Sequence, residues 1–215
     1  MTAFPVEIPD DTEVIETLRY DPDKGCIRRA EHLARLSATC AKLGFSCDIG
    51  DVEAQLDALD GNQFKRIRIS VTRDGEVTVL SPPLTQTPVD WRVRIHPTRL
   101  RSSDPWLKVK TTQRTLYDTA RANLPEGVDE WIFLNKSGEV CEGTITNVFI
   151  QTTDGLITPP VASGLLPGVL RAELIASGRA SEGAVSHKMI TDPDARLLVG
   201  NSLRGLIKVA SVDID

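Results

Sequence analysis

The sequence predicts a protein of mixed α/β (α+β) class, built from two small domains. Its 215 residues suffice for one large or two small domains. Helical and strand-like patterns are mixed along the chain without the strict strand–helix–strand order of a parallel sheet. A polar stretch without periodicity, TRLRSSD at 98–104, interrupts these patterns and is typical of a linker. We therefore expect a small N-terminal α/β domain over 1–100 and a larger C-terminal domain over 101–215.

The first half contains the clearest helix of the chain. Apolar residues at spacings of three and four predict a helix over 28–43: Leu33, Leu36, Cys40 and Leu43. The other elements that the patterns predict are a strand over 14–20, a helix over 51–59 with Asp51 near its N-cap, a hairpin over 64–81 that turns at Asp74-Gly75, and a strand over 91–97.

The second half alternates short strands with short helices. In order, the patterns predict a strand over 106–110, a helix over 111–123, strands within 130–140 and 144–160 with turns at Ser137-Gly138 and Asp154-Gly155, a helix over 169–178 closed by Gly178, a strand over 185–190, a short helix over 192–199 and a last strand over 205–214.

Composition and charge exclude several classes of protein. Lys and Arg total 25 against 30 Asp and Glu, and this net charge of −5 argues against a protein that coats nucleic acid. No apolar run approaches the roughly 18 residues that span a bilayer, and the acidic N-terminus has no apolar core of a secretory signal. The four cysteines form no C-x-x-C pair and do not cluster with the three histidines. We therefore expect a cytoplasmic protein with reduced thiols, no metal site and no membrane partner.

Four separate features could carry chemistry. They are the pair Lys108 and Lys110, predicted to share one face of a strand, the carboxylate of Glu142 before an apolar strand, the glycine-led helix start at 166–171, and the polar insertion at 201–205. Each has an ordinary structural explanation when taken alone. Lysines protect edge strands, a charge often ends a strand, and Pro-Gly commonly precedes a helix.

In combination and order, these features resemble the class IV aminotransferase family, the pyridoxal-phosphate enzymes of fold type IV. EGTITNVF is similar to the family's E-x-x-x-x-N-x-F signature, LLPGVLR to its phosphate-binding segment, and EHLARL to the helix whose arginine holds the phosphate. IETLRYDPDKG and VGNSLRGL are most similar to the 4-amino-4-deoxychorismate lyases of that family. The resemblance extends from Val14 to Val212. It implies the two-domain fold of the D-amino-acid aminotransferases with the cofactor between the domains, and with a shortened N-terminal segment, since most members have an extra hairpin there.

The resemblance implies a role for specific residues in holding pyridoxal 5′-phosphate. Lys110, four residues before Arg114, matches the lysine that bonds to the cofactor aldehyde and then moves the substrate α-proton, whereas Lys108 does not fit this spacing. Glu142 would keep the pyridine nitrogen protonated. Arg35 would bind the phosphate as a forked donor.

The remaining implied residues complete the cofactor site. The family signature supplies Asn147, the helix start supplies the N–H groups of Val169 and Leu170 to the phosphate, and the turn at 201–205 supplies Ser202 and Leu203 on the far side of the pocket. Arg204 would bind a substrate carboxylate.

Three functions follow as expectations from this resemblance. The first is a 4-amino-4-deoxychorismate lyase, which releases pyruvate and 4-aminobenzoate for folate biosynthesis. The second is an amino-acid transaminase for branched-chain or D-amino acids, and the third is a cofactor-binding protein without turnover. For both enzymes we expect a small amino substrate and a homodimer, as is general in the family.

Overall fold

The computed structural model describes residues 4–85 and 88–213, which form two compact units. The first unit comprises the described residues up to 85 together with 109–113, and the second comprises 88–108 and 114–213. These units differ from the predicted division at residue 100 in two places. β5 (Asp90–Leu100) belongs to the second unit because it pairs there with two other strands, and 109–113 belongs to the first.

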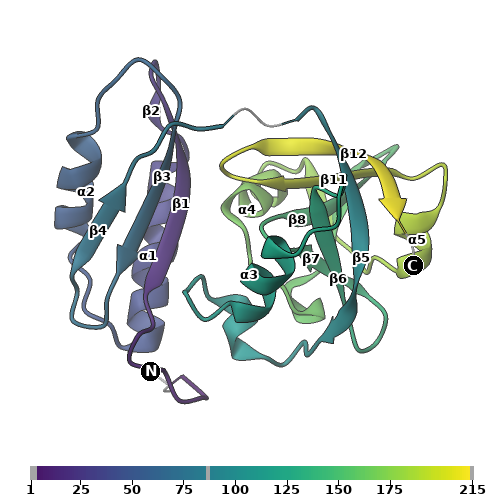
Figure 1. Cartoon of the computed structure of the whole chain (residues 1–215), viewed down its shortest axis with the longest axis horizontal. Coiled ribbons are helices and arrows are strands. Elements are labelled where there is room, and N and C mark those ends of the chain that lie inside the picture. The colour runs from purple at the N-terminus through teal and green to yellow at the C-terminus, as the bar shows by residue number, and fades with distance from the viewer. Residues whose placement is uncertain (1–3, 86–87, 214–215) are drawn as a thin grey trace. The chain divides into compact units, whose positions relative to one another are not determined.

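The first unit is a four-stranded antiparallel sheet with two helices. Its elements are β1 (Val14–Asp21), β2 (Gly25–Cys26), α1 (Arg29–Leu43), α2 (Ile49–Asp57), β3 (Lys65–Val71) and β4 (Val77–Leu80), with the strand order β2-β1-β3-β4. Figure 1 shows α1 behind the strands of this sheet. The predicted hairpin is confirmed, since β3 and β4 pair from Arg68↔Leu80 to Val71↔Val77.

The predicted helix over 28–43 is confirmed as α1, and its apolar stripe is buried. Burial of this stripe, rather than helix propensity, supplies most of the stability of such a helix. The second helix starts earlier than expected. Asp48, not Asp51, is the N-cap of α2, because its carboxylate accepts hydrogen bonds from the N–H groups of Gly50 and Asp51.

The second unit is built on an eight-stranded sheet. After β5 come η1 (Pro105–Lys108), α3 (Thr115–Ala122), β6 (Glu130–Asn135), β7 (Val140–Gly143), β8 (Asn147–Thr152), β9 (Gly155–Thr158), η2 (Val161–Ser163), α4 (Val169–Ala176), β10 (Ala180–Glu182), α5 (His187–Thr191), β11 (Arg196–Asn201) and β12 (Gly205–Asp213). The strand order is β10-β9-β8-β11-β12-β5-β6-β7, and β7 pairs in addition with β8. Six strands, from β8 round to β7, therefore form a closed ring.

The closed ring has an apolar interior and two apolar clusters outside it. Alternate residues of all six strands join one buried cluster, which includes Val93, Ile132 and Val199. A second cluster packs α3 and η1 against Trp131 and Phe133 of β6. A third packs α4 against β8 and β9: Phe149, Leu156, Leu170 and Leu174. These outer clusters fix α3 and the start of α4 on the sheet.

Three element predictions in the second unit are wrong. Residues 105–108 form the 3₁₀ helix η1 instead of a strand. Residues 187–191 form the short helix α5 instead of part of a strand over 185–190. Ser186 caps this helix, because its side chain accepts from the N–H of Met189. The predicted helix over 192–199 is a turn around Asp192 followed by β11, which pairs with β8 and β12. Tertiary pairing overrides local propensity there.

Across the described residues, 4–85 and 88–213, the structure contains no helix with the length and apolar character needed to cross a membrane.

Candidate active site

A short hairpin in the second unit brings two residues of the E-x-x-x-x-N signature together. Glu142 at the end of β7 and Asn147 at the start of β8 are direct cross-strand partners. Both bind the same residue of the segment before α4: Leu166 N donates to Glu142 Oε2 (3.0 Å), and Asn147 Nδ2 donates to Leu166 O (2.9 Å). The five-residue spacing of the signature thus places Glu142 and Asn147 opposite each other in a hairpin. There they bind the backbone N–H and the backbone carbonyl of Leu166, respectively.

The carboxylate of Glu142 is buried and held at both oxygens. The Tyr117 hydroxyl donates to Oε1 over 2.7 Å, while Leu166 N donates to Oε2. Burial and the neighbouring Glu142 carboxylate raise the pKa of Tyr117 far above its usual range, so that the phenol remains a donor. Both donors stabilise negative charge on Glu142.

The start of α4 offers backbone donors without a side-chain cap. Gly168 is the N-cap residue, and as a glycine it has no side chain that could accept from the N–H groups of the first turn. A Cβ at Gly168 would lie 2.0 Å from Asn147 Oδ1, so only glycine permits this approach. The first N–H groups of the helix, including those of Val169 and Leu170, therefore form a potential anion site.

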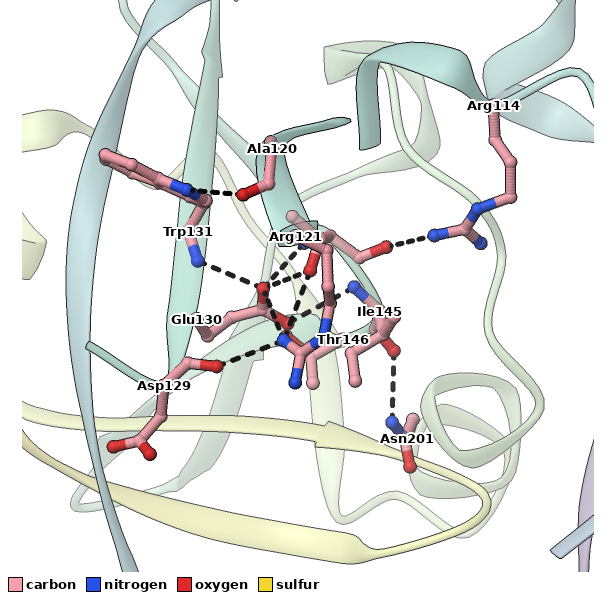
Figure 2. Close-up of polar contacts among 10 residues, drawn as sticks. Arg114, Ala120, Arg121, Asp129, Glu130, Trp131, Ile145, Thr146 and Asn201 are labelled. Atoms are coloured by element: carbon pink, nitrogen blue, oxygen red, sulfur yellow. Dashed lines mark hydrogen bonds and ion pairs between the residues drawn. The ribbon is translucent and has the colours of Figure 1, made fainter. Parts of the chain in front are cut away.

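The turn between Glu142 and Asn147 is fixed by a residue that the sequence patterns did not reveal, Glu130 (Figure 2). Its buried carboxylate accepts from the N–H and hydroxyl groups of the turn and from Trp131: Thr144 N (3.0 Å), Thr144 Oγ1, Ile145 N (3.2 Å), Thr146 Oγ1 (3.1 Å) and Trp131 N (3.0 Å). Arg121 lies 3.4 Å from the same carboxylate. Burial raises the pKa of Glu130, although the hydrogen bonds and Arg121 oppose this shift.

The turn between β11 and β12 is attached to this hairpin. Asn201 Nδ2 donates to Ile145 O (3.1 Å), and Arg204 N donates to Asn201 Oδ1 (2.9 Å), as Figure 2 shows for the first of these bonds. Ser202 and Leu203 are buried, whereas Arg204 is half-buried. The predicted residues of this turn and of the α4 start thus belong to the same unit as Glu142.

The two candidate lysines have different surroundings. Lys108 is exposed at the end of η1, and Lys110 is half-buried in the first unit, where its carbonyl accepts from Ile15 N over 2.9 Å. Thr111 bridges to Val14, so that residues 109–113 run beside β1. The prediction that both lysines project from one strand face is therefore wrong.

Arg114, which follows Lys110, belongs to the second unit. Its Nη2 donates to Thr144 O (2.7 Å), and its Nε pairs with Asp118 (2.8 Å). Arg114 therefore supports the signature turn from α3.

In the first unit, Arg35 is oriented by a fully buried carboxylate. Its Nε and Nη2 donate to the two oxygens of Glu16 (2.7 and 2.8 Å), and His32 Nδ1 lies 2.7 Å from the same carboxylate. Burial alone would raise the pKa of Glu16, but Arg35 and His32 outweigh it and lower the pKa to about 2. Glu16 follows Ile15 on β1, so adjacent residues of one strand hold Arg35 and the Lys110 backbone.

Acid should weaken the first unit through Glu16. Because its folded pKa of about 2 lies below the ordinary value of 4.5, its contribution is complete above pH 4.5 and is lost as the pH falls toward 2. The shift corresponds to about 3 kcal/mol. Urea unfolding between pH 6 and 3 should show this loss, and Glu16→Gln should remove it. The exposed Glu76→Gln is the control, and an unchanged pH dependence in Glu16→Gln would contradict the assignment.

Replacing Glu130 should destabilise the second unit. The amide of Glu130→Gln would face N–H and hydroxyl donors with its own donor group, leaving buried groups unpaired at a cost of about 3 kcal/mol. Urea denaturation measures the effect, with the exposed Glu126→Gln as the matched control. Equal stability of the two variants would show that the turn does not depend on Glu130.

Comparison with known proteins identifies the family of this chain. The family profile described as amino-transferase class IV matches residues 13–212. A solved structure from Mesorhizobium loti, provisionally named an amino-acid aminotransferase, is 43% identical with a TM-score of 0.87, covering 94% of this chain and 100% of that one.

Two curated relatives carry different names. A Thermotoga maritima protein, provisionally named a branched-chain-amino-acid aminotransferase, is 31% identical over 82% of this chain and 67% of its own length. A Schizosaccharomyces pombe protein, provisionally named an aminodeoxychorismate lyase, is 28% identical over 93% of this chain and 89% of its own. The chain belongs to the class IV aminotransferase family, whose enzymes depend on pyridoxal phosphate.

Proposed function

We propose that the protein is a 4-amino-4-deoxychorismate lyase, which converts its substrate into 4-aminobenzoate and pyruvate in folate biosynthesis. The observation that carries this proposal is the match to the S. pombe relative, which spans 93% of this chain and 89% of the relative. The segments IETLRYDPDKG and VGNSLRGL support it. We also propose a cytoplasmic homodimer.

The residues of the second unit fit pyridoxal phosphate. A buried carboxylate with a donor on each oxygen, Glu142, suits a protonated ring nitrogen, because the pair is charge-assisted. The uncapped start of α4 suits a phosphate group. Asn147 keeps Leu166, and with it this helix start, in place. Ser202 and Leu203 are proposed to close the far side of the cofactor pocket.

The first unit is proposed to supply a phosphate donor and the reacting lysine. Arg35 would bind the phosphate, with its guanidinium fixed by Glu16. Lys110 would bond to the cofactor and then take the α-proton of the substrate, and its half-buried position suits this role better than the exposed position of Lys108. When bound, the cofactor supplies a ring that accepts electrons from the substrate α-carbon. Arg204 is proposed to bind a substrate carboxylate.

An amino-acid transaminase for branched-chain or D-amino acids is the second candidate. The M. loti structure favours it, since that protein shares 43% of its residues with this chain and is provisionally named an amino-acid aminotransferase. A cofactor-binding protein without turnover is a third candidate, and turnover itself distinguishes it from the other two.

The lysine assignment predicts different results for two neighbouring variants. Borohydride treatment of the protein loaded with pyridoxal phosphate should fix the cofactor on the peptide that contains Lys110. Lys110→Ala should lose this label and turnover, whereas Lys108→Ala should keep both. Peptide mass mapping measures the site, and a label on Lys108 would overturn the assignment.

Product analysis decides between lyase and transaminase. A lyase should release 4-aminobenzoate from aminodeoxychorismate over many turnovers without an added oxo acid, because the amino group leaves with the product and is not transferred. A transaminase needs a 2-oxo acid as second substrate and follows ping-pong kinetics. Inertness toward aminodeoxychorismate, combined with amino exchange between an amino acid and 2-oxoglutarate, would replace the first candidate by the second.

A further inference from the structure

We propose that Tyr117 is a positioning residue for Glu142, a role that rests on the proposed function of that carboxylate. Tyr117 lies on α3, 25 residues before Glu142, and its hydroxyl donates to Glu142 Oε1 over 2.7 Å. No family signature in the sequence includes this tyrosine.

Packing on two sides fixes the direction of the phenol. The Tyr117 ring contacts the buried Phe133 edge to face, with 5.1 Å between ring centroids, and joins the outer cluster under α3. The Arg114 guanidinium lies 5.6 Å from the Tyr117 ring centroid. Arg114 is itself held by Asp118 and by the carbonyl of Thr144 in the signature turn. The hydroxyl therefore approaches Glu142 from a fixed direction.

Two donors on different oxygens define the orientation of a carboxylate, whereas one donor leaves it able to rotate. Leu166 N holds Oε2, and Tyr117 holds Oε1. A carboxylate has about four acceptor positions, and the partner proposed here for Glu142 is a protonated ring nitrogen. Since burial and the carboxylate keep the phenol protonated, Tyr117 stabilises the negative charge that such a nitrogen needs.

The first test uses the protein without cofactor. Urea unfolding is measured for the wild type, Tyr117→Phe, Glu142→Gln and the double variant. Tyr117→Phe should lower the folding equilibrium constant about tenfold or more in the wild type, and several-fold less in the Glu142→Gln background, because a bond to a charged group is stronger than one to an amide. The chain has one other tyrosine, and Tyr20→Phe is the matched control. Equal effects in both backgrounds would overturn the proposal.

The second test separates positioning from stability. With pyridoxal phosphate bound, Tyr117→Phe should shift the absorption maximum of the cofactor in the same direction as Glu142→Gln and add no further shift in that background. With aminodeoxychorismate, it should lower kcat while KM changes little. Unaltered absorption and kcat in Tyr117→Phe would overturn the positioning role. Normal kcat in Glu142→Gln would instead refute the proposed role of Glu142, and the role of Tyr117 with it, while leaving the coupling in the unloaded protein measurable.

Discussion

The candidate site depends on the hydrogen bonds that the buried carboxylate of Glu130 accepts. It gathers the N–H and hydroxyl groups of the turn at 143–146, which would otherwise be buried without partners. Fixing this turn fixes the register of Glu142 opposite Asn147, and these two residues fix Leu166 and the start of α4. A Cβ at Gly143 would lie 2.5 Å from Thr146 Oγ1 and 2.9 Å from the Glu130 carboxylate, so the hydrogen bond between these two groups also favours glycine next to Glu142. One buried carboxyl group thus orders two separate segments of the chain, the hairpin turn at 142–147 and the start of α4.

A second buried carboxylate has the same effect in the first unit. Glu16 loses its hydration at a cost that only the bidentate Arg35 and the adjacent His32 offset. These contacts orient Arg35, because a guanidinium held at Nε and Nη2 has one direction left for its other donors. Each unit therefore contains a buried glutamate that has no proposed contact with the cofactor but orients a residue that has one. Glu16 orients Arg35, and Glu130 orients Glu142 through the turn.

Local patterns predicted much of this fold but few of its controlling contacts. The helix α1 and the β3–β4 hairpin were predicted because their periodicity and turn residues act within about 18 residues. The errors at 105–108, 187–191 and 192–199 occur where short segments have weak periodicity and distant strands or caps decide the structure. Glu142 and Asn147 were found through a signature. Glu16, Tyr117 and Glu130 were missed because their partners lie 14 to 25 residues away in sequence.

Closure of the second sheet also limits how copies of this chain can associate. Within residues 4–85 and 88–213, the six strands of the ring have neighbours on both sides, and the outermost strands at the other edges include β10 with three residues and β2 with two. At the other edge of the first sheet, β4 has four residues and is followed by Pro82 and Pro83, which cannot donate to a ladder. Strand addition between copies therefore has little exposed backbone to use. The homodimer that we propose would have to form through packed side chains rather than through a sheet that continues from one copy into the next.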